Sequence, residues 1–382
     1  MHRIYLDNAA TSWPKPDAVA AEVEKYLRHG GAPAGRSAYT EAAEAQQAVT
    51  AARAAVARLI GAADAKHIVF THNGTDALNL AIHGLLKPGD HAICTDADHN
   101  SVLRPLRFLE EYRQVEVTRV RCNAFGWVDP DDIRRALRPN TRLVAMLHAS
   151  NVTGVVEPAA QVGAICRQHG ARFLLDAAQS LGHSPVDVNL LNVDLLAAPG
   201  HKGLLGPLGT GVLYLRPGME NELQTVRQGG TGTQSDDDRQ PETLPDRYEC
   251  GNHNVPGLVG LAAALAWLET NGEIWRREHE LAARLRTGLQ KIAGVELHGP
   301  ANGGDCLGVV SVSIAGYDPQ EAAAVLDSTF RVQVRAGLHC APRIHRAMGT
   351  FERGGTVRFS VGAFNTEAEI DAAINAVHEI AN

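Results

Sequence analysis

Short apolar runs alternate with longer amphipathic runs between about residues 67 and 198. Each apolar run is followed by a segment whose apolar positions recur every three to four residues. The apolar runs are residues 67–70, 91–95, 143–150, 172–176 and 193–198. This alternation predicts strand–helix units, which build an α/β fold with a mostly parallel sheet covered by helices on both faces.

Reactive or hydrogen-bonding residues, together with one glycine turn, come directly after these predicted strands. They are Asn73, Gly74, Thr75, His99, Asn151, Asp176, Gln179, His201 and Lys202. In an open parallel sheet the ligand lies beyond the carboxyl ends of the strands, which share one edge. The pattern therefore predicts that these residues meet in a single site.

The order of predicted helices and strands changes after the helical run that ends near Thr270. An amphipathic helix over 275–293 is followed by strand patterns at 309–316 and 356–362 and helical patterns at 318–330 and 366–381, typical of a smaller α+β domain. We expect a large domain over 14–270 and a small domain made of 1–13 and 271–382. The polar, turn-rich segment 227–254 predicts a long functional loop.

Composition narrows the class of ligand. The chain has 382 residues with 45% hydrophobic residues and a net charge of -7, which argues against a nucleic-acid or anionic-membrane surface and favours a small-molecule substrate. The six cysteines form no C-x-x-C pair and no zinc spacing, so neither a disulfide framework nor a metal site is expected. No apolar run is long enough for a signal or a membrane span, and we expect a cytoplasmic protein.

The environment of Lys202 indicates its chemistry. Between Val193 and Leu215 the only charged residues are Asp194 and Lys202. A lysine in apolar surroundings shifts toward its neutral form and can attack a carbonyl, whereas Asp176, at the end of an apolar strand, needs a partner such as a pyridine nitrogen. A strand-end lysine and a helix-capping aspartate are the structural alternatives, and the joint placement of the two residues favours a pyridoxal-phosphate (PLP) site.

An ordered set of motifs covers nearly the whole chain. They are "YLDNAAT" at Tyr5, "FTHNGTDALNLAI", "HASNVTG", "LLDAAQS", "GHKGLLGPLGTGVLY" and "RAGLHCA". In these motifs the chain resembles the cysteine desulfurases, members of the class V aminotransferase group of fold-type I PLP enzymes. The resemblance implies a large domain with a mostly parallel, seven-stranded type of sheet, a smaller α+β domain, and a homodimer with shared sites.

The same resemblance assigns the cofactor contacts. It implies an internal aldimine between Lys202 and PLP, with His99 stacked on the ring and Asp176 against the pyridine nitrogen. The remaining implied contacts are Asn151 and Gln179 at the ring hydroxyl, Gly74, Thr75 and His201 at the phosphate, and Asn252 from the partner subunit. For the substrate it implies that Arg358 binds the carboxylate, with Asn8, Ala9, Asn151 and Arg335 in the same pocket.

Cys340 completes the implied chemistry. The loop "RAGLHCA" places this thiol beside His339 and five residues after Arg335, in the pattern of the SUF-type desulfurases, and nearby cations favour the nucleophilic thiolate. The resemblance implies conversion of L-cysteine to L-alanine, with transfer of the sulfur to Cys340 as a persulfide for an acceptor protein. Lys202, Cys340 and His99 are the expected catalytic residues.

Three departures from the family pattern keep alternatives open. Pro199 stands where a phosphate-binding serine is frequent, Tyr39 where a histidine is common, and Asn252 where a threonine is usual. A selenocysteine lyase, or another class V lyase or transaminase acting on a different amino acid, is the main alternative. A nucleotide-binding oxidoreductase would need a G-x-G-x-x-G after the first strand, which the chain lacks, and a metal or sulfur carrier would use Cys340, His339 and His345.

Overall fold

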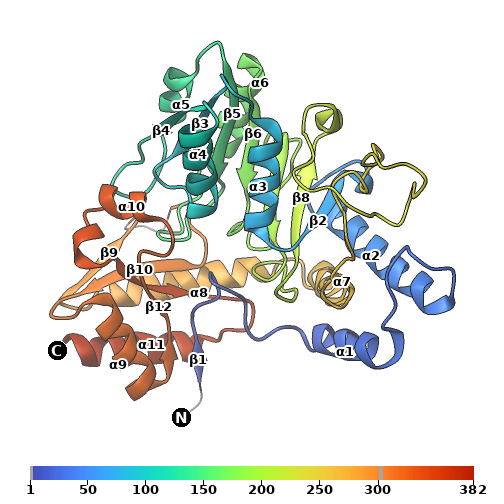
Figure 1. The fold of residues 1–382 in the computed structure, drawn as a ribbon. Coiled ribbons are helices and arrows are strands. Elements are labelled where there is room, and N and C mark those ends of the chain that lie inside the picture. The colour runs from blue at the N-terminus through green and yellow to red at the C-terminus, as the bar shows by residue number, and fades with distance from the viewer. Residues whose placement is uncertain (1–2, 301–303) are drawn as a thin grey trace.

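The computed structural model, which describes residues 3–300 and 304–382, has a seven-stranded sheet at the centre of its larger lobe (Figure 1). Across the sheet the strands are β2 (Ile68–Thr71), β8 (Gly211–Leu215), β7 (Leu195–Pro199), β6 (Arg172–Asp176), β5 (Thr141–Leu147), β3 (His91–Thr95) and β4 (Glu116–Val120). Only β8 runs antiparallel to its neighbours, β2 and β7. The predicted α/β fold with a mostly parallel sheet is confirmed.

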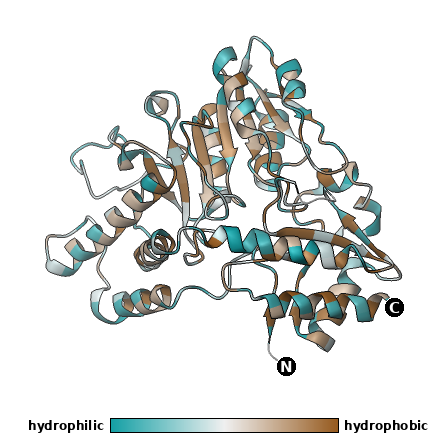
Figure 2. Cartoon of the chain, turned by 180° about the vertical axis from the view of Figure 1, so that it is seen from behind, coloured by the Kyte–Doolittle hydropathy of each residue, from teal (hydrophilic) through white to brown (hydrophobic). Residues whose placement is uncertain are grey.

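The apolar runs form buried strands because both faces of the sheet are covered (Figure 2). In β5, Leu143 and Ala145 pack with one layer of helices and Val144 and Met146 with the other. The first layer is α3 (Gly74–Leu85) and α4 (Asn100–Tyr112); the second contains α2 (Thr40–Leu59), α6 (Ala159–His169) and α7 (Val255–Thr270). A short helix, α5 (Pro130–Ala136), joins β4 to β5.

The smaller lobe is built on a four-stranded antiparallel sheet. Its strand order is β12 (Arg335–Gly337), β13 (Thr356–Ser360), β10 (Val309–Ile314) and β9 (Val295–His298). Its helices are α8 (Ile274–Leu289), α9 (Pro319–Phe330) and α11 (Glu367–Ala381), which share an apolar core with the sheet, and the short α10 (Pro342–Ala347). This arrangement has the α+β character that the sequence predicts for this part of the chain.

The N-terminal segment connects the two lobes. β1 (Ile4–Tyr5) pairs in parallel with β11 (Val332–Gln333), and Leu6 belongs to the core of the smaller lobe. The chain then crosses to α1 (Asp17–Lys25), which packs against α7 of the larger lobe (Figure 1). Residues 6–16 therefore run between the lobes.

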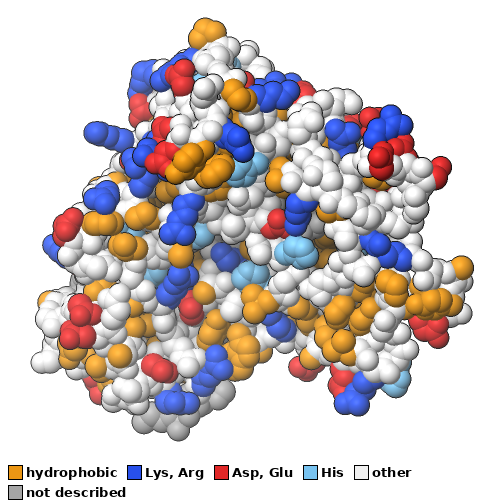
Figure 3. All heavy atoms as spheres, in the orientation of Figure 1, with side chains coloured by type: hydrophobic (Ala, Val, Ile, Leu, Met, Phe, Trp, Pro, Cys, Tyr) orange, Lys and Arg blue, Asp and Glu red, His pale blue; other side chains and the backbone are white. Residues whose placement is uncertain are grey.

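The long polar segment before α7 contains no helix or strand between a one-turn helix that ends at Asn221 and Val255, as predicted for 227–254. None of the helices in the described part of the chain combines the length and apolar character that a bilayer crossing requires. On the face shown in Figure 3, acidic and basic side chains are interspersed.

Candidate active site

A cavity lies where the carboxyl ends of β5, β6 and β7 meet the N-termini of α3 and α4. It is lined by Asn73, Gly74, Thr75, Leu78, His99, Ser101, Leu147, Ala149, Asn151, Asp176, Ala178, Gln179, Pro199, His201 and Lys202. Every predicted cofactor residue except Asn252 is in this lining. The parallel strands bring these residues together because their carboxyl ends share one edge of the sheet.

Lys202 and Asp176 form the charged centre of the cavity. Burial lowers the pKa of Lys202 from 10.5 to about 8, and Asp176 opposes that shift. Burial likewise raises the pKa of Asp176, whose Oδ1 accepts a hydrogen bond from the Ala178 N–H at 3.0 Å. Among the described residues, none accepts a hydrogen bond from the Lys202 ammonium. The amine is therefore available for covalent chemistry at mildly basic pH.

His99 is held as a neutral imidazole with a defined tautomer. Its Nδ1 accepts the backbone N–H of Ser101 at 3.1 Å, so the ring proton lies on Nε2. Burial, together with the charge of Lys202, lowers its pKa to about 4. The Ser101 hydroxyl lies 2.9 Å from this Nδ1 and 2.7 Å from the hydroxyl of Thr75. Ser101 was not predicted from the sequence; its place two residues after His99, at the start of a helix, was the available signal.

One end of the cavity is suited to an anion. Gly74 and Thr75 open α3, and the N–H groups of a first helical turn have no acceptors within the helix. A Cβ on Gly74 would lie 3.1 Å from Cδ of Pro199, so glycine permits this close approach. Pro199 lines the wall without offering a donor.

The residues present fit PLP. Asn151 Oδ1 and His201 Nδ1 are buried without a hydrogen-bond partner in the described residues, and both residues line the cavity. An amine, a buried carboxylate and a helix N-terminus around one cavity match an aldehyde, a pyridine nitrogen and a phosphate, respectively.

Arg358 lies between the lobes on β13 and is fully buried. It donates from Nη2 to Asp7 Oδ1 at 2.7 Å and from Nη1 to the Asn151 carbonyl at 3.0 Å. Its register partner on β12 is Arg335, so two guanidinium groups share this region. Asp7, which the sequence reasoning missed, is the carboxylate that Arg358 contacts in this structure.

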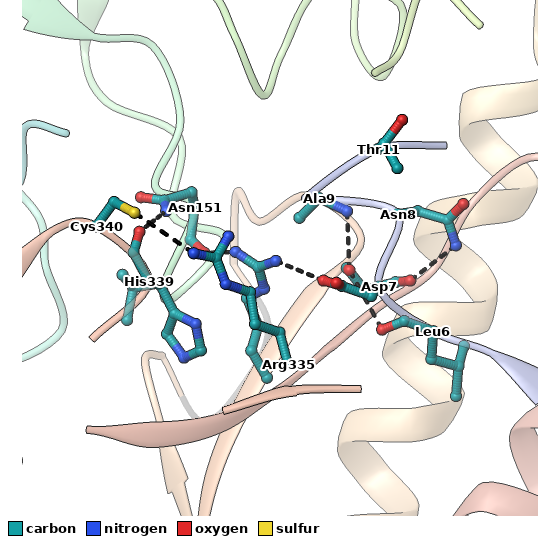
Figure 4. Close-up of polar contacts among 12 residues, drawn as sticks. Leu6, Asp7, Asn8, Ala9, Thr11, Asn151, Arg335, His339 and Cys340 are labelled. Atoms are coloured by element: carbon teal, nitrogen blue, oxygen red, sulfur yellow. Dashed lines mark hydrogen bonds and ion pairs between the residues drawn. The ribbon is translucent and has the colours of Figure 1, made fainter. Parts of the chain in front are cut away.

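The two predicted substrate residues of the N-terminal motif lie beside the cavity and are not among its lining residues. The Asn8 side chain, labelled in Figure 4, hydrogen-bonds within the smaller lobe, to the Ser360 carbonyl at 3.0 Å and to Asn365 at 3.3 Å. Ala9 touches the site through its carbonyl, which accepts from Gln179 Nε2 at 3.1 Å.

The thiol of Cys340 is exposed at a groove next to the cavity, and Thr75, His99 and Ser101 line both. Arg335 Nη2 lies 3.4 Å from its Sγ (Figure 4). His339 and Cys340 both have left-handed backbone, with φ of 48° and 58°, which is costly for two successive non-glycine residues.

Two hydrogen bonds hold this loop against the larger lobe. The His339 carbonyl accepts from Asn151 Nδ2 at 2.6 Å, and the Cys340 carbonyl accepts from the Asn100 N–H at 2.8 Å. Asn151 therefore touches both the cavity and the loop.

The other residues that the sequence singled out lie away from the cavity or bind other partners. Asn252 is exposed in a separate pocket with Glu249 and His253, and Tyr39 is also exposed. In the described ranges, no three His, Cys, Asp or Glu side chains are close enough to form a metal site. The imidazoles of the possible carrier site hydrogen-bond elsewhere: His339 to Thr356 and His345 to Thr350.

Comparison with known proteins gives a consistent result along the whole chain. Residues 4–373 match the family described as aminotransferase class-V. A protein of Methanothermobacter thermautotrophicus described as a probable cysteine desulfurase is 37% identical, over 99% of this chain and 94% of the relative. A protein of Anaeromyxobacter named cysteine desulfurase IscS is 36% identical, over 97% of this chain and 90% of the relative.

Solved structures agree with these sequence relatives. The apo structure of a cysteine desulfurase from Thermococcus onnurineus NA1 has a TM-score of 0.92 and 34% identity, covering 99% of this chain and 94% of that chain. The cysteine desulfurase CsdA of Escherichia coli has a TM-score of 0.89 and 30% identity, with the same coverage of 99% and 94%.

Proposed function

This chain belongs to the aminotransferase class-V family, among its cysteine desulfurases, and we propose that it uses PLP to convert L-cysteine to L-alanine while Cys340 takes the sulfur. The observation that carries the proposal is the adjacency of two parts. A cavity with a desulfurase-like set of Lys202, Asp176 and His99 opens beside a groove that exposes the Cys340 thiol.

The cavity residues divide into three roles. PLP bound in the cavity supplies an electron sink, which acidifies the α-carbon of an amino acid and weakens its C–S bond. Lys202 would hold the cofactor and, once free, act as a base, since with a pKa of about 8 roughly a tenth of the amine is neutral at pH 7. Asp176 would keep the ring nitrogen protonated, and Gly74, Thr75 and His201 would bind the phosphate.

The substrate carboxylate would be bound by the arginines between the lobes. Arg358 is held in place by Asp7 and by the Asn151 carbonyl, and Arg335 lies beside it on β12. No described carboxylate forms an ion pair with Arg335, so its charge is available to an incoming anion. Two cations in a partly buried site favour an α-carboxylate over an uncharged group.

The sulfur step uses Cys340 and the neutral His99. The Cys340 thiolate, next to the Arg335 guanidinium, attacks the substrate sulfur; an S–S bond forms as the substrate Cβ–S bond breaks. The electron pair of the broken bond stays with the three-carbon skeleton, which takes up a proton and leaves as alanine. His99, held neutral with its ring proton on Nε2, would donate a hydrogen bond from that atom, and the proton taken up by the carbon skeleton would come from the protonated Lys202 amine.

The proposal also covers the oligomeric state of the protein and the transfer of the sulfur to an acceptor. We infer a cytoplasmic homodimer in which the exposed segment around Asn252 reaches the cofactor phosphate of the partner subunit. The exposure of Cys340 supports transfer of the persulfide to an acceptor protein. The full-length match to cysteine desulfurases supports cysteine as the substrate.

The test is a comparison of Cys340→Ala with Cys306→Ala, a partly exposed cysteine outside the cavity and outside segment 227–254. With cysteine as substrate, C340A is expected to lose alanine and sulfide release by about 100-fold or more, because the nucleophile is gone, with unchanged visible absorbance of bound PLP. C306A should keep its activity. Undiminished cysteine turnover in C340A would refute the persulfide route, and turnover of selenocysteine alone would identify the selenocysteine lyase alternative.

A further inference from the structure

The carbonyl oxygen of His201, which belongs to the peptide bond leading into Lys202, collects an unusual number of hydrogen bonds. Its donors all come from the N-terminal segment 11–15: Thr11 Oγ1 at 3.2 Å, Ser12 N and Ser12 Oγ at 3.1 Å, and Lys15 Nζ at 2.8 Å. Ser12 Oγ also lies 3.0 Å from the carbonyl of Lys202 itself. The N-terminal segment thus holds both peptide carbonyls at the catalytic lysine.

We propose that Lys15 is a positioning residue for Lys202, acting through the carbonyl of His201. This inference rests on the proposed function only in that Lys202 is the residue that carries the cofactor.

Lys15 makes the strongest of these contacts. A carbonyl has two lone pairs, so its donors compete, and the charged donor at the shortest distance dominates. Lys15 also donates to Ser12 Oγ at 2.6 Å, which leaves the Ser12 hydroxyl proton to point at the two carbonyls. Lys15 therefore fixes the peptide directly and through Ser12.

Lys15 does not have the environment of an ordinary exposed lysine. The side chain is half-buried, and no carboxylate of a described residue pairs with it. Burial lowers its pKa to about 8. An ammonium that gives up water without a counter-ion is costly, and the contacts that offset this cost are the His201 carbonyl and the Ser12 hydroxyl.

The turn is held on its opposite side by close backbone packing. Gly203 follows Lys202, and a Cβ on it would lie 2.3 Å from the Leu181 carbonyl and 2.8 Å from the His183 ring. The lysine turn is therefore pressed between the turn after β6 and the N-terminal segment. Removal of Lys15 would weaken the contacts with the N-terminal segment and leave the packing of Gly203 against the turn after β6 unchanged.

The same segment reaches the substrate end of the site. Asp7 binds Arg358, and Figure 4 shows Asp7, Asn8, Ala9 and Thr11 following one another along this segment. The Ala9 carbonyl accepts from Gln179 before the chain arrives at His201. Residues 7–15 thus form one continuous brace between the arginine that would bind the substrate and the lysine that would bind the cofactor. Lys15 is its charged attachment to the lysine turn.

The experiment compares Lys15→Met and Lys15→Arg with Lys25→Met, which removes an exposed lysine from α1. For each protein we would measure the rate at which the cofactor-free form captures added PLP, by visible absorbance, and kcat and KM for cysteine. Thermal unfolding of the cofactor-free form reports the folded fraction.

K15M is expected to lower both the capture rate and kcat by about ten-fold with KM changed less than about two-fold, since a misplaced reactive group affects the chemical step. K15R should restore most of the loss, and K25M should match the wild type. A K15M protein with wild-type capture rate and kcat would overturn the inference, as would a loss explained entirely by a smaller folded fraction.

If K15M does not fold, Ser12→Ala tests the same carbonyl contacts and should slow capture in the same direction; an unchanged capture rate would overturn the inference. PLP capture needs no cysteine. A wild-type protein that captures PLP at Lys202 but releases no sulfur would reject the proposed function and leave the test of Lys15 intact.

Discussion

The lowered pKa of Lys202 sets the pH range over which the rate of PLP capture changes. Only the neutral amine attacks an aldehyde, and burial lowers the pKa of Lys202 from 10.5 to about 8. At pH 7 about one amine in ten is then neutral, against roughly one in three thousand for an ordinary lysine, a gain of about 300-fold. We expect the capture rate to rise with pH and to level off above pH 8.

Asp176→Asn provides a second perturbation with a defined sign. The Asp176 carboxylate favours the ammonium form of Lys202, so its removal should lower the pKa of Lys202 further and move the midpoint of capture below pH 8. The variant should also hold PLP more weakly, because the ring nitrogen loses its partner.

The assay mixes cofactor-free protein with PLP in buffers from about pH 6 to 10 and follows visible absorbance. A soluble lysine analogue in the same buffers corrects for titration of PLP itself, and Lys202→Ala gives the background. A rate that keeps rising through pH 10, as for an exposed lysine, would refute the assigned environment. So would a midpoint that moves upward in the Asp176→Asn variant.

Three further variants test other parts of the structure. Glu249→Ala leaves the buried Arg53 guanidinium without its partner oxygens at 2.6 and 2.8 Å, so the free energy of unfolding in urea should fall by roughly 3–5 kcal/mol; a loss below about 1 kcal/mol would contradict the pairing. Gly203→Ala places a Cβ 2.3 Å from a backbone oxygen and should impair both stability and PLP capture, whereas Gly272→Ala, with no atom nearer than 3.7 Å, should spare both; equal effects would contradict the packing argument. Arg358→Gln should raise KM for cysteine by about ten-fold or more, and an equal effect on cysteamine, which has no carboxylate, would show that Arg358 does not bind that group.

The larger sheet could be predicted in outline because its strands have a local signature. β3, β5, β6 and β7 are apolar runs between helical patterns, and burial on both faces requires such composition. The antiparallel insertion of β8 between β2 and β7 had no comparable signal. Strand direction depends on how the connections pass through space, which a local pattern does not encode.

Most cavity residues could be predicted for a related reason. Asp176 and Lys202 stand just after predicted strands, and parallel strands carry such residues to one edge. The contacts of Asp7 and Lys15 could not be foreseen. They depend on the path of residues 6–16 between the lobes, which is fixed by pairing of β1 with β11, more than 300 residues later in the chain.

The sequence alone determined the alternation of strands and helices, the edge of the sheet that carries the chemistry, and the resemblance that connects Lys202 and Cys340 to one reaction. The tertiary structure alone decided that Arg358 is buried against Asp7, that Asn151 holds the Cys340 loop, and that Lys15 supports the lysine turn. The division has a physical reason. Periodicity and strand-end position are local properties of the chain, whereas these three contacts join residues far apart in the sequence and exist only once the chain has folded.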